Sequence, residues 1–282
     1  MPVKIISDST CDLSKKIIEK YDIDITPLIV SLGEKNGKDG VDITPEDIYR
    51  YVNETGRLSK TGAVNIEEYE KVFKKWLDSG YEIVQFCIGS LFSSSYQNAC
   101  IAAEELKGVH VVDTGNLSSG QGLIVVRAAE LATEGATAEK IVSECMNMID
   151  RVEASFVVDS IDYLYKGGRC SSLAALGANL FHIKPCIEVK DGKMTAAKKY
   201  RGNINRVIKN YVEDRLAGRT DIDPKRIFIT HSKCDDEILK KVYDMIRTLQ
   251  PDIEEIYDTT AGATVTTHCG PGTCGVLFVR KA

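Results

Sequence analysis

The sequence predicts an α/β protein of two domains, with a parallel sheet in the first domain and a mixed sheet in the second. The first half alternates apolar strand patterns with helical patterns, whereas the second half carries additional hairpin signals. At 282 residues the chain is longer than one typical domain and has enough sequence for two buried cores. We expect domains at residues 1–152 and 153–282, with a cleft between them.

The first half contains short β-branched runs that predict strands, and between them runs with apolar residues at helical spacing. Strands are expected at Val3–Ser7, Ile25–Leu32, Tyr81–Ile88 and Gly108–Asp113. Helices are expected from about Leu13, near Pro45 and Ile66, after Ser95, and around Gln121 and Thr137. Between Leu32 and Thr44 a polar segment predicts a hairpin that projects from the sheet edge, with Asn36-Gly37 as its turn.

The second half begins near Ala154 with an apolar strand pattern over residues 155–159. The residues Lys190–Lys193 predict a hairpin turn between two short strands. The remaining elements are expected as helices at Asn203–Leu216 and Asp235–Leu249, and strands at Arg226–His231, Ile253–Tyr257 and Gly275–Arg280.

Charge and hydropathy exclude several classes of protein. The net charge is −5, and the 36 Lys and Arg residues are spread along the chain, so nucleic acid is not an expected partner. No apolar run approaches the roughly 20 residues of a membrane span, and the N-terminus leads into a strand pattern without a signal peptide's apolar core. We therefore expect a cytoplasmic protein.

The nine cysteines are scattered and contain no C-x-x-C pair. Most have apolar neighbours, which favours buried thiols over a disulfide framework or a zinc site, so no metal is expected. Cys269 and Cys274 flank a Gly-Pro-Gly turn, and the sequence assigns them no role.

Common nucleotide and protease motifs are absent. The residues Gly270–Gly275 match the letters G-x-G-x-x-G, but they lead into the last strand and lack the helix and acidic residue that a dinucleotide site requires. No P-loop, H-E-x-x-H or G-x-S-x-G sequence occurs. The chain therefore does not resemble a kinase or a metalloprotease.

A cluster of hydroxyl groups at Ser90–Ala99 follows a strand and precedes a helix. Ser93, Ser94 and Ser95 are expected at or just before the helix start, where free backbone N–H groups and the helix dipole favour an anion. This pattern predicts an anion-binding corner. The alternative is that one serine caps the helix and the other two are small loop residues.

Other segments carry candidate ligand-binding groups. His268, expected on a short connection before a glycine turn, could donate a hydrogen bond or act as a base, although a lone histidine is commonly structural. Asp8–Thr10 follows the first strand at the sheet edge where α/β proteins bind ligands, and its alternative role is a helix cap, for which Asp12 is equally eligible. Lys60–Ala63 and Lys166–Ser172 offer weaker signals, the second as a phosphate-binding loop or an ordinary turn before a helix.

In this order, these segments resemble the DegV family of bacterial fatty-acid-binding proteins. The resemblance extends from Ser7 to the last strand and rests on Ser7–Thr10, Lys60-Thr61, Ser90–Ala99, Val158–Arg169, Lys184-Pro185 and His268–Gly275.

The resemblance implies a two-domain α/β fold with a long-chain fatty acid in a tunnel at the domain junction. It implies that the carboxylate meets Thr61, Ser93 and His268, with no cofactor and no catalytic residue. Two hydroxyls, a helix N-terminus and an imidazole suit this role, because a carboxylate in a water-poor site needs several hydrogen bonds. Gly62 replaces the family's usual serine and Phe92–Tyr96 its usual Leu-Ser-Gly-Thr-Tyr, which makes Ser94 a fourth candidate.

The resemblance also implies partners. Related proteins present the fatty acid to a separate kinase, which converts the carboxylate to an acyl phosphate. Arg169 and Arg201 are then candidates for a basic patch that docks this kinase, with ordinary solvated loops as the alternative. Transient contact with a membrane is compatible with such a carrier.

Two enzymatic functions compete with the carrier hypothesis. In a hydrolase, Ser93 would be the nucleophile and His268 its base, with Asp8, Asp113 or Asp159 orienting the base. Ser93 lacks the small-residue elbow of such nucleophiles, which disfavours this function. A sugar- or phosphate-binding enzyme would use the Ser93 corner and the Gly167-Gly168 loop, and would require a polar pocket.

Overall fold

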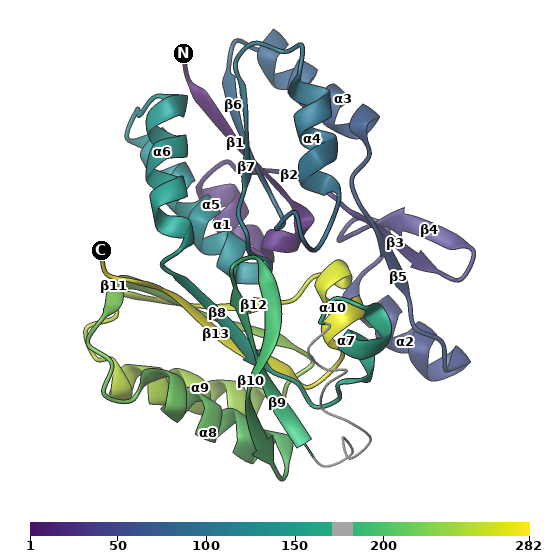
Figure 1. Ribbon diagram of the computed structural model, residues 1–282, viewed down its shortest axis with the longest axis vertical. Helices are drawn as coiled ribbons and strands as arrows, with labels where there is room; N and C mark the ends of the chain where they lie inside the picture. The colour runs from purple at the N-terminus through teal and green to yellow at the C-terminus, as the bar shows by residue number, and fades with distance from the viewer. Residues whose placement is uncertain (171–182) are drawn as a thin grey trace.

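The computed structural model describes residues 1–170 and 183–282, and these residues form an α/β fold (Figure 1). The first sheet is wholly parallel, as the alternating pattern predicts, and its strand order is β2-β1-β6-β7. Its strands are β1 (Val3–Asp8), β2 (Asp24–Thr26), β6 (Glu82–Cys87) and β7 (Val109–Asp113).

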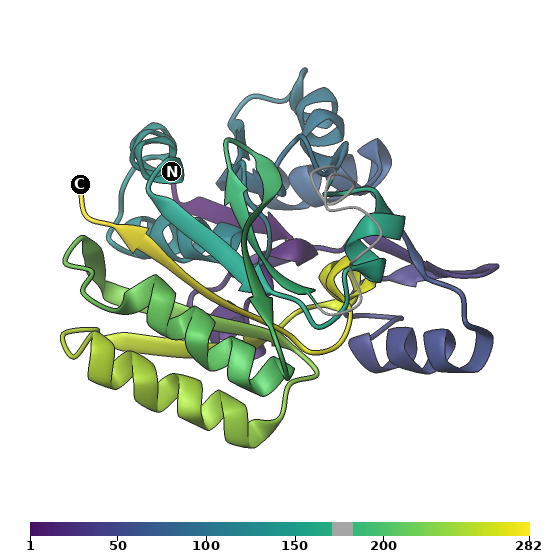
Figure 2. The ribbon, with the colours of Figure 1, turned by 60° about the horizontal axis from the view of Figure 1, so that its bottom comes forward.

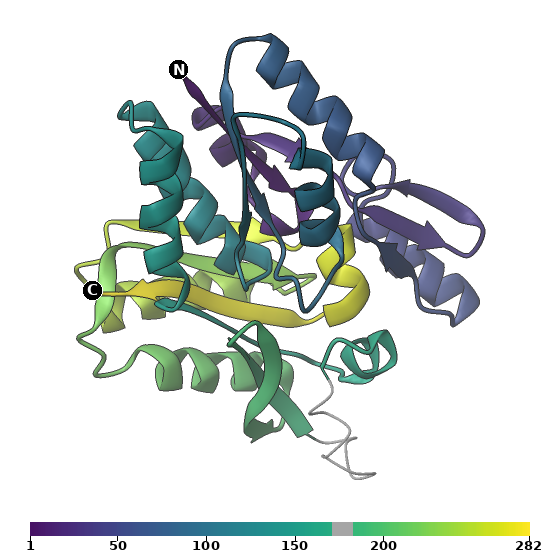
Figure 3. The ribbon, with the colours of Figure 1, turned by 45° about the horizontal axis from the view of Figure 1, so that its top comes forward.

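Helices cover both faces of this parallel sheet (Figure 3). One face packs on α3 (Ile66–Asp78) and α4 (Ser95–Ala103), and the other on α5 (Ser118–Thr133) and α6 (Ala138–Ile149). Alternate residues of β6 enter the two cores, because successive side chains of a strand point to opposite faces. This two-sided burial explains the nearly continuous apolar character of β6.

The second sheet is mixed, with the strand order β10-β9-β8-β13-β11-β12. β11 and β12 pair in parallel, and the other neighbours are antiparallel. Two helices, α8 (Ile204–Leu216) and α9 (Asp236–Leu249), lie side by side against one face (Figure 2). The strands are β8 (Val152–Val157), β9 (Ile183–Lys190), β10 (Lys193–Arg201), β11 (Ile222–Ser232), β12 (Glu255–Thr260) and β13 (Thr273–Arg280).

Helix α5 joins the two sheets into one core. It is buried on almost every side, and its apolar residues share a cluster with Phe86 of the parallel sheet and with Ala154 and Leu277 of the mixed sheet. A helix that is apolar all round is expected in such a position. Strand β8 opens the mixed sheet at Val152, three residues earlier than its predicted start. The domain limits 1–152 and 153–282 stay a prediction.

A small antiparallel sheet, β4-β3-β5, corrects two details of the prediction. The expected single strand Ile25–Leu32 is divided into β2 and β3 (Ile29–Leu32) around Pro27, which has no N–H to donate to a sheet. The hairpin exists, but it turns at Gly33-Glu34, where Gly33 has φ +67°. The predicted turn Asn36-Gly37 instead lies within β4 (Lys35–Lys38).

Short helices complete the described fold. They are η1 (Ser9–Cys11), α1 (Lys15–Lys20), α2 (Pro45–Thr55), α7 (Asp162–Gly167) and α10 (Ala263–Cys269). The prediction that His268 lies on a short connection is wrong, because it lies in the last turn of α10. Three β-branched threonines and a valine lower the intrinsic helix propensity of this segment, so tertiary contacts stabilise it. In Figure 1, α10 lies beside α7 and close to β5 (Lys60–Gly62).

Candidate functional site

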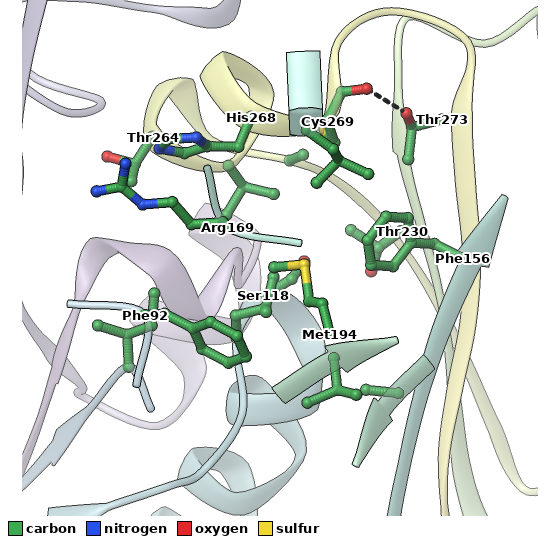
Figure 4. A pocket seen from close by; sticks show the side chains of 18 of the residues that line it. Phe92, Ser118, Phe156, Arg169, Met194, Thr230, Thr264, His268, Cys269 and Thr273 are labelled. Carbon is green, nitrogen blue, oxygen red and sulfur yellow. Dashed lines mark hydrogen bonds between the residues drawn. The ribbon is translucent and has the colours of Figure 1, made fainter. Parts of the chain in front are cut away.

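A cavity lies where the mixed sheet, α5, α7 and α10 approach one another (Figure 4). Most of its wall is apolar, and the side chains come from both halves of the chain. Among the apolar residues that line it are Leu28, Ile88, Phe92, Phe156, Met194 and Leu277. Such a wall suits a hydrocarbon and offers little to a sugar, which disfavours the polar pocket that a sugar-binding enzyme would need.

Thr61, Ser93 and His268, the three residues predicted to meet a carboxylate, all line this cavity. Thr61 comes from β5, Ser93 from the loop between β6 and α4, and His268 from α10. The Thr61 hydroxyl and the His268 Nε2 atom are 2.8 Å apart and share a hydrogen bond, although 207 positions separate the residues. The fold therefore gathers polar groups from distant segments at one cavity.

The His268 imidazole is neutral in this environment. Burial, together with the smaller effect of the positive charge of Arg169, lowers the pKa of His268 from 6.5 to about 4. The Nδ1 atom is buried and has no hydrogen-bond partner among the described residues. Gly167 packs so closely that a Cβ atom built there would lie 2.6 Å from Nδ1. The ring is therefore held tightly, and one of its nitrogens is unsatisfied.

The serine corner differs from its predicted arrangement. Ser93 Oγ accepts the backbone N–H of Ser95 at 3.2 Å and shares a hydrogen bond with Ser95 Oγ at 2.9 Å. Ser95 Oγ accepts the N–H of Val64, and Ser94 is the N-cap residue of α4 but makes no side-chain cap hydrogen bond. Ser94 is exposed and lies outside the cavity lining. Ser93 alone of the three both faces the cavity and bonds the helix start.

The two arginines predicted to dock a kinase lie in different settings. Arg169 is exposed yet lines the cavity, and its Nη1 atom donates to the Gly167 carbonyl at 2.7 Å. Figure 4 shows its guanidinium beside His268 and Thr264. Arg201 is the exposed last residue of β10 and does not line the cavity. The predicted phosphate loop Lys166–Ser172 extends past Cys170, so its last residues and the helix predicted after it lie outside the described residues.

Asp8 does not reach the cavity and has the structural role that the sequence left open. Its carboxylate accepts the N–H of Thr10, as a cap of η1, and the N–H of Ile88 at 2.6 Å. Burial raises the pKa of Asp8 above its ordinary value, and hydrogen bonds oppose that shift. By holding Ile88, Asp8 fixes the end of β6 from which the Ser93 loop departs.

Sequence reasoning missed further residues of the lining. Thr264 lies four positions before His268 on α10, so both face the cavity on one side of the helix. Ser118, the first residue of α5, also lines it and has φ +54°, a conformation rare for serine. Helical spacing could have found Thr264 if α10 had been predicted, whereas no local signal marks Ser118.

The geometry does not assemble a hydrolase. Among the described residues no carboxylate hydrogen-bonds to His268, and Ser93 bonds only to Ser95. Cys269 and Cys274 have buried free thiols, and burial raises the pKa of Cys269 to about 12, so its thiol is unreactive. No group of three or more His, Cys, Asp and Glu side chains in the described part of the chain could hold a metal ion.

An apolar cavity with a small group of hydroxyl and imidazole groups on its wall is typical of a binding site for a molecule with an apolar part and a polar group. Comparison with known proteins makes this class specific. The family model described as "Uncharacterised protein, DegV family" matches residues 2–281. The chain therefore belongs to the DegV family.

Individual relatives cover nearly the whole chain. A Thermotoga maritima protein called "Fatty acid-binding protein" is 32% identical, with 98% of this chain and 96% of that protein covered. A solved DegV family structure from Thermus thermophilus, named for fatty acid binding, has a TM-score of 0.88 at 28% identity and covers 99% of this chain and 100% of its own. A stearic acid-binding protein from Eubacterium ventriosum has a TM-score of 0.82 at 28% identity, with coverages of 99% and 98%.

These structures confirm the predicted fold class, a parallel-sheet region followed by a mixed-sheet region. Within the described ranges, no helix is both long enough and apolar enough to cross a membrane.

Proposed function

We propose that this protein binds a long-chain fatty acid in an interdomain tunnel formed by the cavity, with its carboxylate held by Thr61, Ser93 and His268. The observation that carries the proposal is the convergence of these three groups, from distant segments, on one largely apolar cavity. The names of relatives that cover almost the whole chain support the same ligand class.

The polar groups suit a carboxylate. Thr61 and the neutral imidazole of His268 share one hydrogen bond, so together they leave one donor for the carboxylate, and the hydroxyl of Ser93 supplies a second. Arg169 adds a positive charge beside His268 that the prediction from sequence did not include. Together these groups replace the water that a buried carboxylate loses.

The apolar wall supplies most of the affinity. At about 0.8 kcal/mol per buried methylene, an acyl chain of about fourteen methylenes gains on the order of 11 kcal/mol before ordering costs are subtracted. That gain is large enough for a ligand to remain bound through purification. Phe156, Met194 and Leu277 would contact the chain in this arrangement.

Native mass spectrometry followed by denaturing extraction tests the proposal. We expect a fatty acid of about 14 to 18 carbons at close to one per protein. Delipidated protein should take up palmitate, stearate or oleate from solution. If neither the purified protein nor the protein incubated with these acids carries one, the proposed function is wrong.

The protein then presents the bound carboxylate to a separate kinase for acyl-phosphate formation. Arg169 supports this step because it is exposed at the cavity and lies close to His268. Arg201 is the second residue proposed for docking. Because such a kinase uses ATP, the proposal places the protein in the cytoplasm, where transient membrane contact supplies the acid.

A reconstituted reaction tests the kinase step. Loaded protein, ATP and a purified bacterial fatty-acid kinase should yield an acyl phosphate that hydroxylamine traps. Arg201→Ala should lower the rate with palmitate still bound, and Arg169→Ala should lower it even at palmitate concentrations that keep the protein loaded. Rates equal to that of the unchanged protein would contradict the docking role.

A further inference from the structure

Helix α10, which carries His268, begins between two carboxylates from the first half of the chain. The Gly262 N–H donates to Asp12 Oδ1 at 2.8 Å, and the Ala263 N–H donates to Asp39 Oδ1 at 2.8 Å. These pairs are separated by 250 and 224 positions in the sequence. Two of the free N–H groups at the helix start are thus satisfied by distant acidic residues.

Each carboxylate is itself fixed by a second contact. Ser118 Oγ donates to Asp12 Oδ2 at 2.5 Å, and Ser9 Oγ donates to Asp39 Oδ2 at 2.8 Å. The exposed fractions of Asp12 and Asp39 are only 5% and 4%. Both acids are therefore held in place and cannot follow the helix if it moves.

Glycine is required between the two acids. A Cβ atom at Gly262 would lie 3.1 Å from Asp12 Oδ1 and 3.3 Å from Asp39 Oδ1. These distances are tighter than ordinary contacts, and both carboxylates are fixed, so a side chain would displace the helix start. The two fixed carboxylates and the close approach at Gly262 therefore hold the first residues of α10 in one place.

This arrangement is costly for a simple helix cap. A single neutral serine or asparagine caps most helices, whereas here two carboxylates are buried near each other. Burial raises the pKa of Asp12 to about 8, and the neighbouring charge of Asp39 adds to the shift. The cost indicates that the placement of α10 matters beyond helix formation.

The position of the helix start determines where His268 lies. Six residue steps separate Gly262 from His268, which at 1.5 Å per residue is about 9 Å along the axis. A small tilt at the start therefore moves the imidazole away from Thr61 Oγ1, which lies 2.8 Å from Nε2. At the other end Gly167 limits the imidazole from the side of α7.

We propose that Asp12 and Asp39 are positioning residues, which fix the start of α10 so that His268 meets Thr61 at the cavity. The consequence for ligand affinity rests on the proposed function, whereas the consequence for His268 does not. The acids themselves stay outside the cavity lining, and one lining side chain, that of Ser118, donates to Asp12.

The test compares Asp12→Ala and Asp39→Ala with Asp12→Asn and Asp39→Asn in delipidated full-length protein. The first readout is the ¹⁵N resonances of the His268 ring, assigned by their loss in His268→Gln. The second is palmitate affinity. The alanine variants should shift the His268 resonances and lower affinity about two- to tenfold, the loss expected when one ordinary hydrogen bond at the helix start is removed. The asparagine variants should retain both, because the amide oxygen accepts the same N–H.

Asp47→Ala is the matched control, because Asp47 accepts a backbone N–H at the start of α2, makes no hydrogen bond to α10 and lies outside the cavity lining. It should change neither readout. If both alanine variants fail to fold, Gly262→Ala provides the same test by forcing a methyl group between the two carboxylates.

Folded alanine variants with an unchanged His268 spectrum would overturn the proposal, even if palmitate affinity fell. A shifted spectrum with unchanged affinity would support the positioning role and contradict the proposed role of His268 in binding the carboxylate. The two proposals therefore fail in distinguishable ways.

Discussion

The Ser93 corner and the His268 helix contribute to the same cavity but are held in place differently. Ser93 hydrogen-bonds two positions away, to Ser95, in a loop that β6 and α4 define locally. His268 depends on Thr61, 207 positions away, and on a helix start held by Asp12 and Asp39. Ser93 is therefore positioned by contacts within its own segment, whereas His268 is positioned by contacts with residues far away in the sequence.

This difference has physical consequences. The Ser93 corner keeps backbone N–H groups of the α4 start even when the hydroxyl is lost, because the helix itself supplies them. At His268, no set of backbone N–H groups at a helix start replaces the side chain if it is lost. Its imidazole is a single buried group between Thr61 and Gly167, so we expect changes there to have larger effects.

The largest expected effect is on stability as a function of pH. Because the folded state lowers the pKa of His268 from 6.5 to about 4, it favours the neutral imidazole. This contribution is complete above pH 6.5 and is lost as the pH falls through 4, and 2.5 pH units correspond to about 3 kcal/mol. Urea unfolding of delipidated protein at several pH values should show it as a difference between the unchanged chain and His268→Gln. Ser93→Ala should keep the full difference, and its loss there would contradict the contrast between the two regions.

Removing the imidazole should have the next largest effect, this time on ligand binding. His268→Ala removes a buried donor and leaves the carboxylate short of a partner, which should lower palmitate affinity on the order of 10- to 100-fold. Competition with a fluorescent fatty acid measures the change. His110→Ala, on β7 and outside the cavity lining, is the control and should bind normally. Equal affinities for the two variants would remove His268 from the site.

Crowding the imidazole should have a smaller effect. In Gly167→Ala the new methyl group would lie 2.6 Å from His268 Nδ1, so the ring must move, and overpacking of this kind costs about 1–3 kcal/mol. We expect palmitate affinity to fall about tenfold, since 1.4 kcal/mol is a factor of ten. Gly168→Ala strains a residue with φ +69° but meets nothing within 4 Å, so it should cost stability without weakening binding. If Gly167→Ala bound palmitate as well as Gly168→Ala or better, crowding of the His268 ring would not matter for binding.

Removing the Ser93 hydroxyl should have the smallest effect. Ser93→Ala leaves the N–H groups at the start of α4 in place, so the loss is that of one ordinary hydrogen bond, about fivefold in affinity. The same displacement assay measures it, beside an esterase assay with p-nitrophenyl esters. An esterase activity that disappears in this variant would favour the hydrolase. If Ser93→Ala lowered palmitate affinity as much as His268→Ala, the Ser93 corner would depend on its one hydroxyl as strongly as the other region depends on its imidazole.

Much of the fold is visible in local patterns. Period-2 and helical spacings place most strands and helices within a few residues of their observed bounds, because side chains that share a face must share a chemistry. The exceptions are the division at Pro27, the turn at Gly33, helix α10, and the short elements β5 and α7, which the patterns did not predict. The first two have local causes: Pro27 has no N–H to donate to a sheet, and Gly33 adopts the positive φ of the turn. In α10, tertiary contacts override a β-branched sequence with little helical character.

By itself the sequence determined the α/β class, the resemblance to DegV proteins and the serine corner, because each depends on patterns among residues that are close together in the sequence. Only the tertiary structure decided that Thr61 bonds His268, that Arg169 lines the cavity and that Asp12 and Asp39 hold α10. These contacts join residues that are far apart along the chain. A hydrogen bond depends on distance in space, and no local spacing in a sequence specifies that distance.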